Sequence, residues 1–175
     1  NDDALTFDYS YFKNIKETVI IYGNLPFNIS TNLLTKWISD NEWPSFFNKM
    51  VLMFQREVAD RILASHNNKK YGRLSVLVQS RCVVKKLLDA PASIFSPKPK
   101  VDGTVIQLEP IDNFSEINFN NLEKLLEQSF SSRRKKIKNT LKKHKQSLTK
   151  LNIDENLRPE NLSVSNYCDL VKLIN

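Results

Sequence analysis

The chain has 175 residues, of which 41% are hydrophobic, and this composition excludes a disordered protein and allows one buried core with a small appendage. It contains no run of about 18 apolar residues and opens with no secretory leader, so we expect no membrane span and no export. The net charge of +7 is concentrated in residues 131–150, which hold nine of the 26 basic residues and none of the 19 acidic ones.

Four short runs rich in Val, Ile and Leu predict β-strands, because near-continuous apolar runs are typical of strands that are covered on both faces. They occupy residues 19–25, 49–55, 74–80 and 104–110, with turn-forming residues around them. Helical patterns separate the first three runs. This alternation of strands and helices indicates an α/β layer with a parallel sheet.

Two amphipathic helices are predicted between these strands. The first covers 31–40 after Ser30, a predicted N-cap, and the second covers 56–66. Each helix places apolar side chains on one face: Leu33, Leu34, Trp37 and Ile38 in the first, and Val58, Ile62 and Leu63 in the second. We expect Arg56 and Glu57 to form an ion pair or a cap.

The character of the chain changes after Pro110. Three helical patterns follow one another, at 120–130, 133–145 and 164–174, with no further strand signal. We therefore predict two domains, an α/β domain over residues 1–110 and a small helical domain over residues 111–175.

The stretch GNLPFNIS, residues 23–30, follows directly on the first apolar run. In open α/β sheets, ligands lie outside the carboxyl ends of the strands, which is where this stretch falls. The Asn24 side chain and the Leu25 carbonyl can both accept from one amine, Pro26 adds no competing N–H, and Phe27 offers a flat face for stacking. A planar base with an exocyclic amine fits these groups. A plain strand-end turn is the alternative that this stretch alone leaves open.

GNLPFNIS resembles the active-site motif of the ribosomal RNA adenine dimethyltransferase family, whose Asn-Leu-Pro-Tyr/Phe binds the target adenine. Three further blocks are similar to the same family and follow in the expected order: QREVADRI with YGRLSV at 55–62 and 71–76, IFSPKPKVDG at 94–103, and SRRKKIKNTL at 132–141. Within the family, the chain is most similar to the bacterial small-subunit enzymes. The resemblance implies the C-terminal part of a Rossmann-like class I methyltransferase sheet, followed by a small all-helical domain.

The resemblance also implies a site for the target adenine. Asn24 and the carbonyl of Leu25 would hold the adenine amine, beside Pro26, while Phe27 and Phe95 would stack on the flipped base. Stacking contributes on the order of 1–3 kcal/mol per base, which is comparable to the cost of extruding a base. These five residues are the predicted catalytic set.

A partial cofactor site is implied in the same way. Asp3 would accept from the adenine amine of S-adenosylmethionine, Ala4 would offer its backbone N–H to that ring, and Asn24 would border both ligands. Read without the resemblance, Asp3 is an ordinary turn aspartate. The cofactor assignment therefore depends on the family pattern.

The chain departs from this pattern in two residues and one absence. Phe27 replaces a frequent Tyr, and Gly103 stands where Ser usually follows Val-Asp, a change that we expect to lie outside the proposed chemistry. The glycine-rich cofactor loop cannot be formed from the three glycines, which include Gly23 and Gly72, and the first residue is Asn1. We therefore expect an N-terminally truncated enzyme without most of its cofactor site.

The basic segment predicts contact with RNA. Nine cations without an acid in twenty residues favour phosphate binding over a merely solvated helix face. On one helix these cations would lie away from the apolar side chains of Ile137 and Leu141. Arg73, next to the predicted sheet, would extend the basic surface. The predicted RNA-binding residues are Arg73, Arg133, Arg134, Lys135, Lys136, Lys138 and Lys142.

Together these features predict dimethylation of two adjacent adenines near the 3′ end of 16S rRNA in the small ribosomal subunit, with S-adenosylmethionine as methyl donor. The main task of the enzyme is to position the adenine amine against the methyl donor, because that donor is already activated. Two alternatives remain open: a macrolide-resistance 23S rRNA adenine methyltransferase, whose motif usually reads Asn-Ile-Pro, and a non-catalytic ribosome-assembly factor that binds RNA. His66 and His144 receive no role, and no metal site is expected.

Cys82 and Cys168 have neither metal-ligand nor disulfide spacing, which indicates buried small hydrophobes in a reducing cytoplasm. We expect a monomer for the full-length enzyme. In the truncated chain, residues 18–22 are expected to form an open sheet edge that pairs with a copy of itself.

Overall fold

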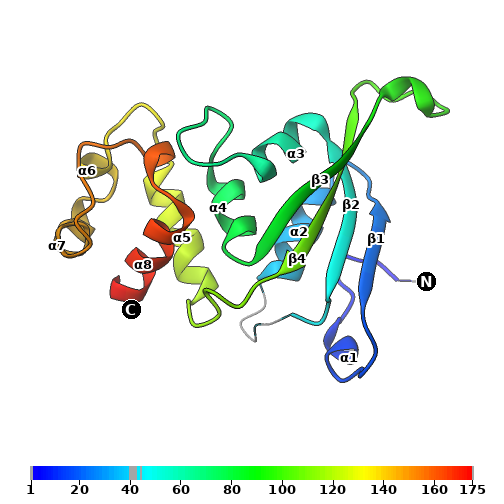
Figure 1. Cartoon of the computed structure of the whole chain (residues 1–175), viewed down its shortest axis with the longest axis horizontal. Coiled ribbons are helices and arrows are strands. Elements are labelled where there is room, and N and C mark those ends of the chain that lie inside the picture. The colour runs from blue at the N-terminus through cyan, green and yellow to red at the C-terminus, as the bar shows by residue number, and fades with distance from the viewer. Residues whose placement is uncertain (1, 40–42, 44, 175) are drawn as a thin grey trace.

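A computed structural model describes residues 2–39, 43 and 45–174 of the chain. Its centre is a four-stranded sheet in the order β1-β2-β4-β3 (Figure 1). The strands are β1 (Ile20–Asn24), β2 (Lys49–Gln55), β3 (Cys82–Ala90) and β4 (Gly103–Pro110). β1 runs parallel to β2, whereas β4 is antiparallel to both β2 and β3. The sheet is therefore mixed, and the prediction of a parallel sheet holds only for its first two strands.

Three of the four predicted strands are confirmed, and one is wrong. The run 74–80 lies in α4 (Arg73–Gln79), where Ser75, Val76, Leu77 and Val78 are all buried. A helix that is buried on most sides loses its amphipathic period, so its sequence cannot be told from that of a buried strand. In the missed strand, β3, Lys85, Lys86 and Asp89 break the apolar residues into short pieces, which hid it from a search for apolar runs.

The helices of the first part are α1 (Ser10–Lys13), α2 (Ser30–Ile38), α3 (Arg56–Leu63) and α4, and in Figure 1 α2 to α4 lie on one side of the sheet. The predicted apolar face of α2 is confirmed. The N-cap prediction is wrong, because Ser30 is the first helical residue and its hydroxyl donates to the Phe27 carbonyl at 3.2 Å. The predicted end at Asp40 lies outside the described residues.

Both residues at the start of α3 form ion pairs, as expected, but with separate partners. Arg56 forms its ion pair with Asp102, at 3.4 Å, and Glu57 pairs with Arg61 one helical turn away. Successive residues on a helix point in different directions, so both side chains find partners elsewhere. The Arg56–Asp102 pair ties the start of α3 to the segment that precedes β4.

The second part consists of α5 (Phe119–Ser129), α6 (Ile137–Thr140), α7 (Lys145–Lys150) and α8 (Val164–Ile174), with short 3-10 turns at Lys142–His144 and Pro159–Asn161. The predicted helices at 120–130 and 164–174 are confirmed. The continuous basic helix at 133–145 is wrong. Residues 133–136 are not helical, and the first amides of α6 donate to the carbonyls of Leu157 and Glu155 in a neighbouring loop.

One buried cluster runs through both parts of the chain. It includes Leu52 and Ile106 from the sheet and Leu126 and Leu170 from the helices that follow. The sheet ends at Pro110, but the core continues across that point, and the domain boundary at 110/111 stays a prediction. Within the described ranges, no helix is both long and apolar enough to cross a membrane.

Candidate functional site

A cavity of about 320 Å³ opens where the carboxyl end of β1 meets the loop between β3 and β4, and we call it the Asn24 cavity. All five residues of the predicted catalytic set line it, although Phe95 is some 70 residues away in sequence from the others. The full lining is Asn24, Leu25, Pro26, Phe27, Met53, Phe95, Pro97, Pro99, Val101 and Gly103. The fold therefore brings the two sequence motifs to one place.

The first wall of the cavity is a tight turn between β1 and α2. The Pro26 carbonyl accepts from the amides of Ile29 and Ser30, both at 3.1 Å, which fixes the turn immediately after the motif. A β-carbon on Gly23 would lie 2.9 Å from Leu25 Cδ2 and 3.3 Å from Leu52 Cδ2, so the strand end has no room for a side chain there. The turn holds Asn24 at the cavity while Phe27 is half-buried.

The second wall and the floor contain residues that sequence reasoning missed. Pro97, Pro99 and Val101 continue the wall from Phe95, and Met53 and Gly103 lie at the adjoining ends of β2 and β4. A β-carbon on Gly103 would lie 3.0 Å from the Met53 sulfur. Gly103 therefore lines the cavity, and its expected lack of effect on the chemistry stays a prediction. Met53 gave no local signal, since it is brought to the cavity by the pairing of β2 with β1, where it is the partner of Asn24, and with β4.

The chemistry of the cavity follows from its lining. The side-chain amide of Asn24 makes no hydrogen bond to the described residues, and the other side chains of the lining are apolar. None of the lining residues has an acidic or basic side chain, so the cavity offers no group for proton transfer near neutral pH. It can bind a flat aromatic ligand between apolar walls and orient an amine on its edge.

The predicted cofactor residues lie in the N-terminal segment, outside the lining of the Asn24 cavity. The Asp3 carboxylate accepts from the Leu5 amide at 2.9 Å, and the Ala4 carbonyl accepts from the Tyr9 hydroxyl at 3.0 Å. Lys36 of α2 donates to two carbonyls of this segment, at 2.7 and 2.8 Å. Because α2 begins just after the Asn24 turn, these hydrogen bonds link the N-terminal segment to the helix that follows the turn. A cofactor role for Asp3 and Ala4 stays a prediction.

The predicted RNA-binding cations fall into two groups. Arg73 pairs with Glu127 at 2.8 Å, Arg133 donates to two backbone carbonyls, and Lys136 and Lys138 both reach the Asn156 side chain, at 3.4 and 3.0 Å. Three others form no ion pair within the described part of the chain: Arg134, Lys135 and Lys142. The free group remains available for phosphate, while the engaged group contributes to holding the helical part in place.

Replacing Arg133 with Met is expected to lower thermal stability without changing the salt dependence of RNA binding. Its guanidinium donates to the carbonyls of Lys69 and Tyr71, both at 2.7 Å, and so joins the loop before α4 to the segment before α6. Hydrogen bonds from charged donors contribute on the order of 1.5–3 kcal/mol. Thermal unfolding measures the effect, with Arg134→Met as the matched control. Equal melting temperatures for the two variants would contradict this structural role.

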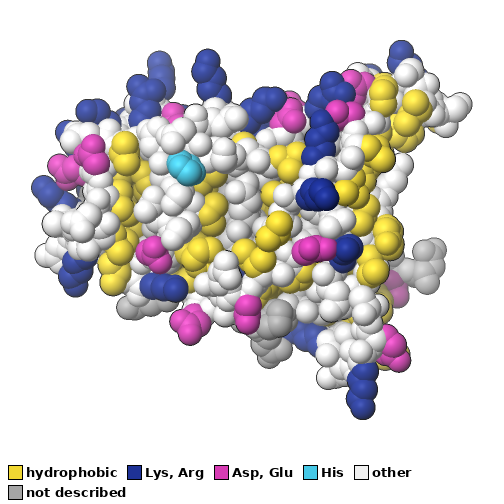
Figure 2. Space-filling view, viewed as in Figure 1, with side chains coloured by type: hydrophobic (Ala, Val, Ile, Leu, Met, Phe, Trp, Pro, Cys, Tyr) yellow, Lys and Arg dark blue, Asp and Glu magenta, His cyan; other side chains and the backbone are white. Residues whose placement is uncertain are grey.

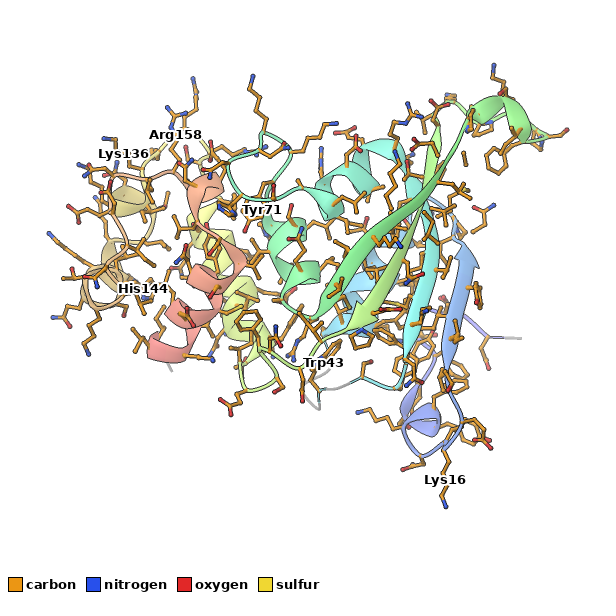
Figure 3. The ribbon with its side chains drawn as sticks, viewed as in Figure 1. Lys16, Trp43, Tyr71, Lys136, His144 and Arg158 are labelled. Atoms are coloured by element: carbon orange, nitrogen blue, oxygen red, sulfur yellow. The ribbon has the colours of Figure 1, made fainter. Side chains whose placement is uncertain are left out.

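The cysteines and histidines have no part in the cavity. Cys82 and Cys168 are buried free thiols, and burial raises the pKa of each to about 12, so both stay protonated and unreactive. Burial, with a smaller contribution from Lys143, lowers the pKa of His144, whose labelled position in Figure 3 is in the helical part. No group of side chains suited to a metal ion occurs among the residues that the structure describes.

Known proteins resemble the chain over nearly its whole length. The family model for ribosomal RNA adenine dimethylase matches residues 1–175. Ribosomal RNA small subunit methyltransferase A from Ehrlichia chaffeensis is 45% identical over 99% of this chain and 66% of its own length. The protein of the same name from Pelagibacter ubique is 44% identical over 98% of this chain and 67% of its own length. The chain thus spans about two thirds of the length of these relatives.

Solved structures share the fold. A dimethyladenosine transferase from Plasmodium falciparum, 26% identical, superimposes with a TM-score of 0.79 over 97% of this chain and 71% of that chain. The 23S rRNA methyltransferase ErmE, 18% identical with a TM-score of 0.61, shows the fold alone. The sheet is that of a Rossmann-like methyltransferase, followed by a helical part. With a family model that matches every residue and relatives above 40% identity, the chain belongs to the ribosomal RNA adenine dimethylase family.

Proposed function

We propose that the intact protein dimethylates the exocyclic amines of two adjacent adenines near the 3′ end of 16S rRNA, in the cytoplasm, during maturation of the small ribosomal subunit. The observation that carries this proposal is the Asn24 cavity, which combines one free amide, two aromatic side chains and an otherwise apolar lining. A flipped adenine presents a flat ring for the apolar walls and an amine for the amide. Membership of the family supports the same substrate.

In the proposed mechanism, the protein positions the reacting amine. The Asn24 side-chain oxygen and the Leu25 carbonyl accept from the two amine hydrogens, which directs the nitrogen lone pair away from the ring. Phe27 and Phe95 hold the ring by stacking, and Pro26 fixes the turn that carries both acceptors. S-adenosylmethionine, when bound, supplies an activated methyl group. The alkylated amine is acidic enough to lose its proton to water, in keeping with a cavity that has no titratable lining.

The chain supplies a few groups that could hold the cofactor. The second oxygen of the Asp3 carboxylate makes no hydrogen bond to the described residues and could accept from an adenine amine, and the Ala4 amide could donate to the same ring. The three glycines, Gly23, Gly72 and Gly103, lie apart from one another and form no glycine-rich loop. On the residues of this chain alone, we propose at most weak binding of S-adenosylmethionine, and turnover is to be measured with the intact gene product.

We propose that RNA contacts the free cations of the helical part. Arg134, Lys135 and Lys142 lie in the segment that carries the chain's excess of positive charge. Phosphate contacts of this kind position an RNA without reading its sequence. The ion pair of Arg73 and the carbonyl contacts of Arg133 make these two residues supports for the surface rather than contacts to it.

Transfer of labelled methyl groups tests the proposed function. Small subunits from cells that lack this modification should accept label from S-adenosylmethionine in the presence of the intact protein, whereas large subunits should not. Label in the large subunit alone would favour the 23S rRNA activity instead. Binding to small subunits without any transfer would favour the non-catalytic assembly factor.

The 175-residue chain is expected to self-associate through β1. In the described sheet β1 pairs only with β2, and its Tyr22 side chain is 70% exposed beside a half-exposed Ile20. An open edge with apolar side chains pairs readily with another strand. Light scattering should show a dimer or larger species, and Tyr22→Lys should shift it toward the monomer, with Tyr11→Lys as the control. A monomer before any substitution would contradict the prediction.

A further inference from the structure

An RNA that is bound at the Asn24 cavity brings negatively charged phosphates to its mouth, and the residues that line the cavity carry no charge to neutralise them. A nucleotide whose base enters the cavity keeps a phosphate on each side of its sugar, outside the base site. The first wall comes from residues 23–30, which contain no charged residue. The second wall comes from residues 94–103, which contain Lys98, Lys100 and Asp102. Any positive charge that the walls bring to the mouth therefore comes from the two lysines.

The two lysines alternate with the residues that line the cavity. Phe95, Pro97, Pro99 and Val101 form the wall, and Lys98 and Lys100, which lie between them in sequence, are exposed. Neither lysine lines the Asn24 cavity. One short segment thus offers an apolar surface to a base and two cations beside that surface.

A second cavity lies against the other side of the same segment. It measures about 490 Å³, and Lys100 lines it together with Val101, which it shares with the Asn24 cavity. The other two cations of this second cavity are neutralised, because Arg56 pairs with Asp102 at 3.4 Å and Lys70 pairs with Asp60 at 2.6 Å.

Lys98 and Lys100 have no such partners. Among the residues that the structure describes, neither forms an ion pair. Cations without an ion-pair partner are available to an anionic ligand without first breaking an internal bond.

The same edge of the molecule continues toward the helical part. In Figure 2, Lys and Arg side chains follow the upper edge of the view from the helical part to the tip of the β3–β4 hairpin. Lys136 and Arg158 lie along that edge in Figure 3, while Lys16 lies at the opposite end of the molecule. An RNA bound at the helical part could therefore reach the mouth of the Asn24 cavity along an edge that carries many Lys and Arg side chains.

We propose that Lys98 and Lys100 bind the phosphates that flank the flipped adenosine. This inference rests on the proposed function, because it assigns the position of the RNA backbone at the same site. A lysine binds phosphate as a point charge, and holding the backbone at the mouth limits the positions that the base can take inside. The segment that carries Phe95 then orients the base and the backbone together. Both lysines are positioning residues, since neither touches the reacting amine.

The test uses the intact protein and a short RNA hairpin with the two adjacent adenosines in its loop. One version carries uncharged methylphosphonate linkages on both sides of the target adenosine. The double variant Lys98→Gln, Lys100→Gln should lower the slope of log affinity against log salt concentration by about 1.4, from about 0.7 for each contact to a single strand. The matched control is Lys16→Gln with Lys124→Gln, two exposed lysines without ion pairs in the described ranges, which should leave the slope unchanged.

The methylphosphonate RNA separates this inference from a general loss of charge. Unmodified protein should bind it more weakly than the natural RNA, whereas the double lysine variant should bind both equally. If both proteins lose the same factor, the lysines do not contact these phosphates and the inference is overturned. Methyl transfer by the unmodified protein to the natural RNA, measured alongside, shows whether the proposed function holds when the inference fails. If that protein neither binds nor methylates the RNA, both are overturned.

Discussion

Replacing Asn24 with Ala in the intact protein is expected to lower kcat by about 100-fold or more while leaving RNA affinity nearly unchanged. Asn24 contributes the only free amide in the cavity, and no phosphate contact is assigned to it. Loss of one well-placed acceptor costs roughly 2.7–4 kcal/mol in the transition state, because no water can replace it with the same orientation. Single-turnover methylation and RNA binding, measured on the same preparation, separate the two effects.

Asn28→Ala is the matched control for this variant. Asn28 is an exposed amide four residues further along the same turn and does not line the cavity. Its variant should retain full turnover. An Asn24→Ala enzyme that keeps more than about a tenth of normal activity would remove Asn24 from its proposed role.

The second large effect is expected from Phe95→Ala. Phe95 is half-buried and comes from the β3–β4 hairpin, so its ring approaches the cavity from the wall opposite the Asn24 turn. Removing one stacking face should lower kcat/KM by roughly 5- to 150-fold, which corresponds to about 1–3 kcal/mol. Steady-state kinetics with the RNA hairpin gives this ratio, and Phe95→Tyr should keep most of the activity because the flat face remains.

Its neighbour Ile94 serves as the control, since that side chain is 68% exposed and does not line the cavity. Ile94→Ala should behave as the unmodified protein. Equal losses for Phe95→Ala and Phe95→Tyr would show that the position responds to any change in shape and that stacking is not the cause.

The fold could be predicted from sequence where local pattern and burial agreed. β1, β2 and β4 are short apolar runs, of which β2 and β4 are largely buried, and α5 and α8 keep a clear apolar face. The prediction failed at residues 74–80, where burial on most sides of α4 removed the period of the helix. It failed again at β3, where Lys85, Lys86 and Asp89 interrupt the apolar residues, so that only the pairing with β4 identifies the strand.

Some residues of the candidate site could likewise be predicted from the sequence, and others could not. The Asn24 turn is local, since four consecutive residues supply its groups, and Phe95 was found only through the resemblance to a family. Met53 and Gly103 could not be found, because Met53 is placed by the register of β2 against β1 and β4, and Gly103 by that of β4 against β2. The number of basic residues could be read from the sequence, but the hydrogen bonds from Arg133 to backbone carbonyls of another loop could not. Tertiary contacts decide which cations remain free.

Mapping the methyl groups on 16S rRNA tests the central claim most directly. Small subunits that lack the modification would be incubated with the intact protein and S-adenosylmethionine, and the RNA fragments analysed by mass spectrometry. Our account predicts two adjacent N6,N6-dimethyladenosines near the 3′ end of 16S rRNA, formed at least about 100-fold more slowly by the Asn24→Ala enzyme. Methylation at another nucleotide, or the same two products formed at the normal rate by the Asn24→Ala enzyme, would contradict it.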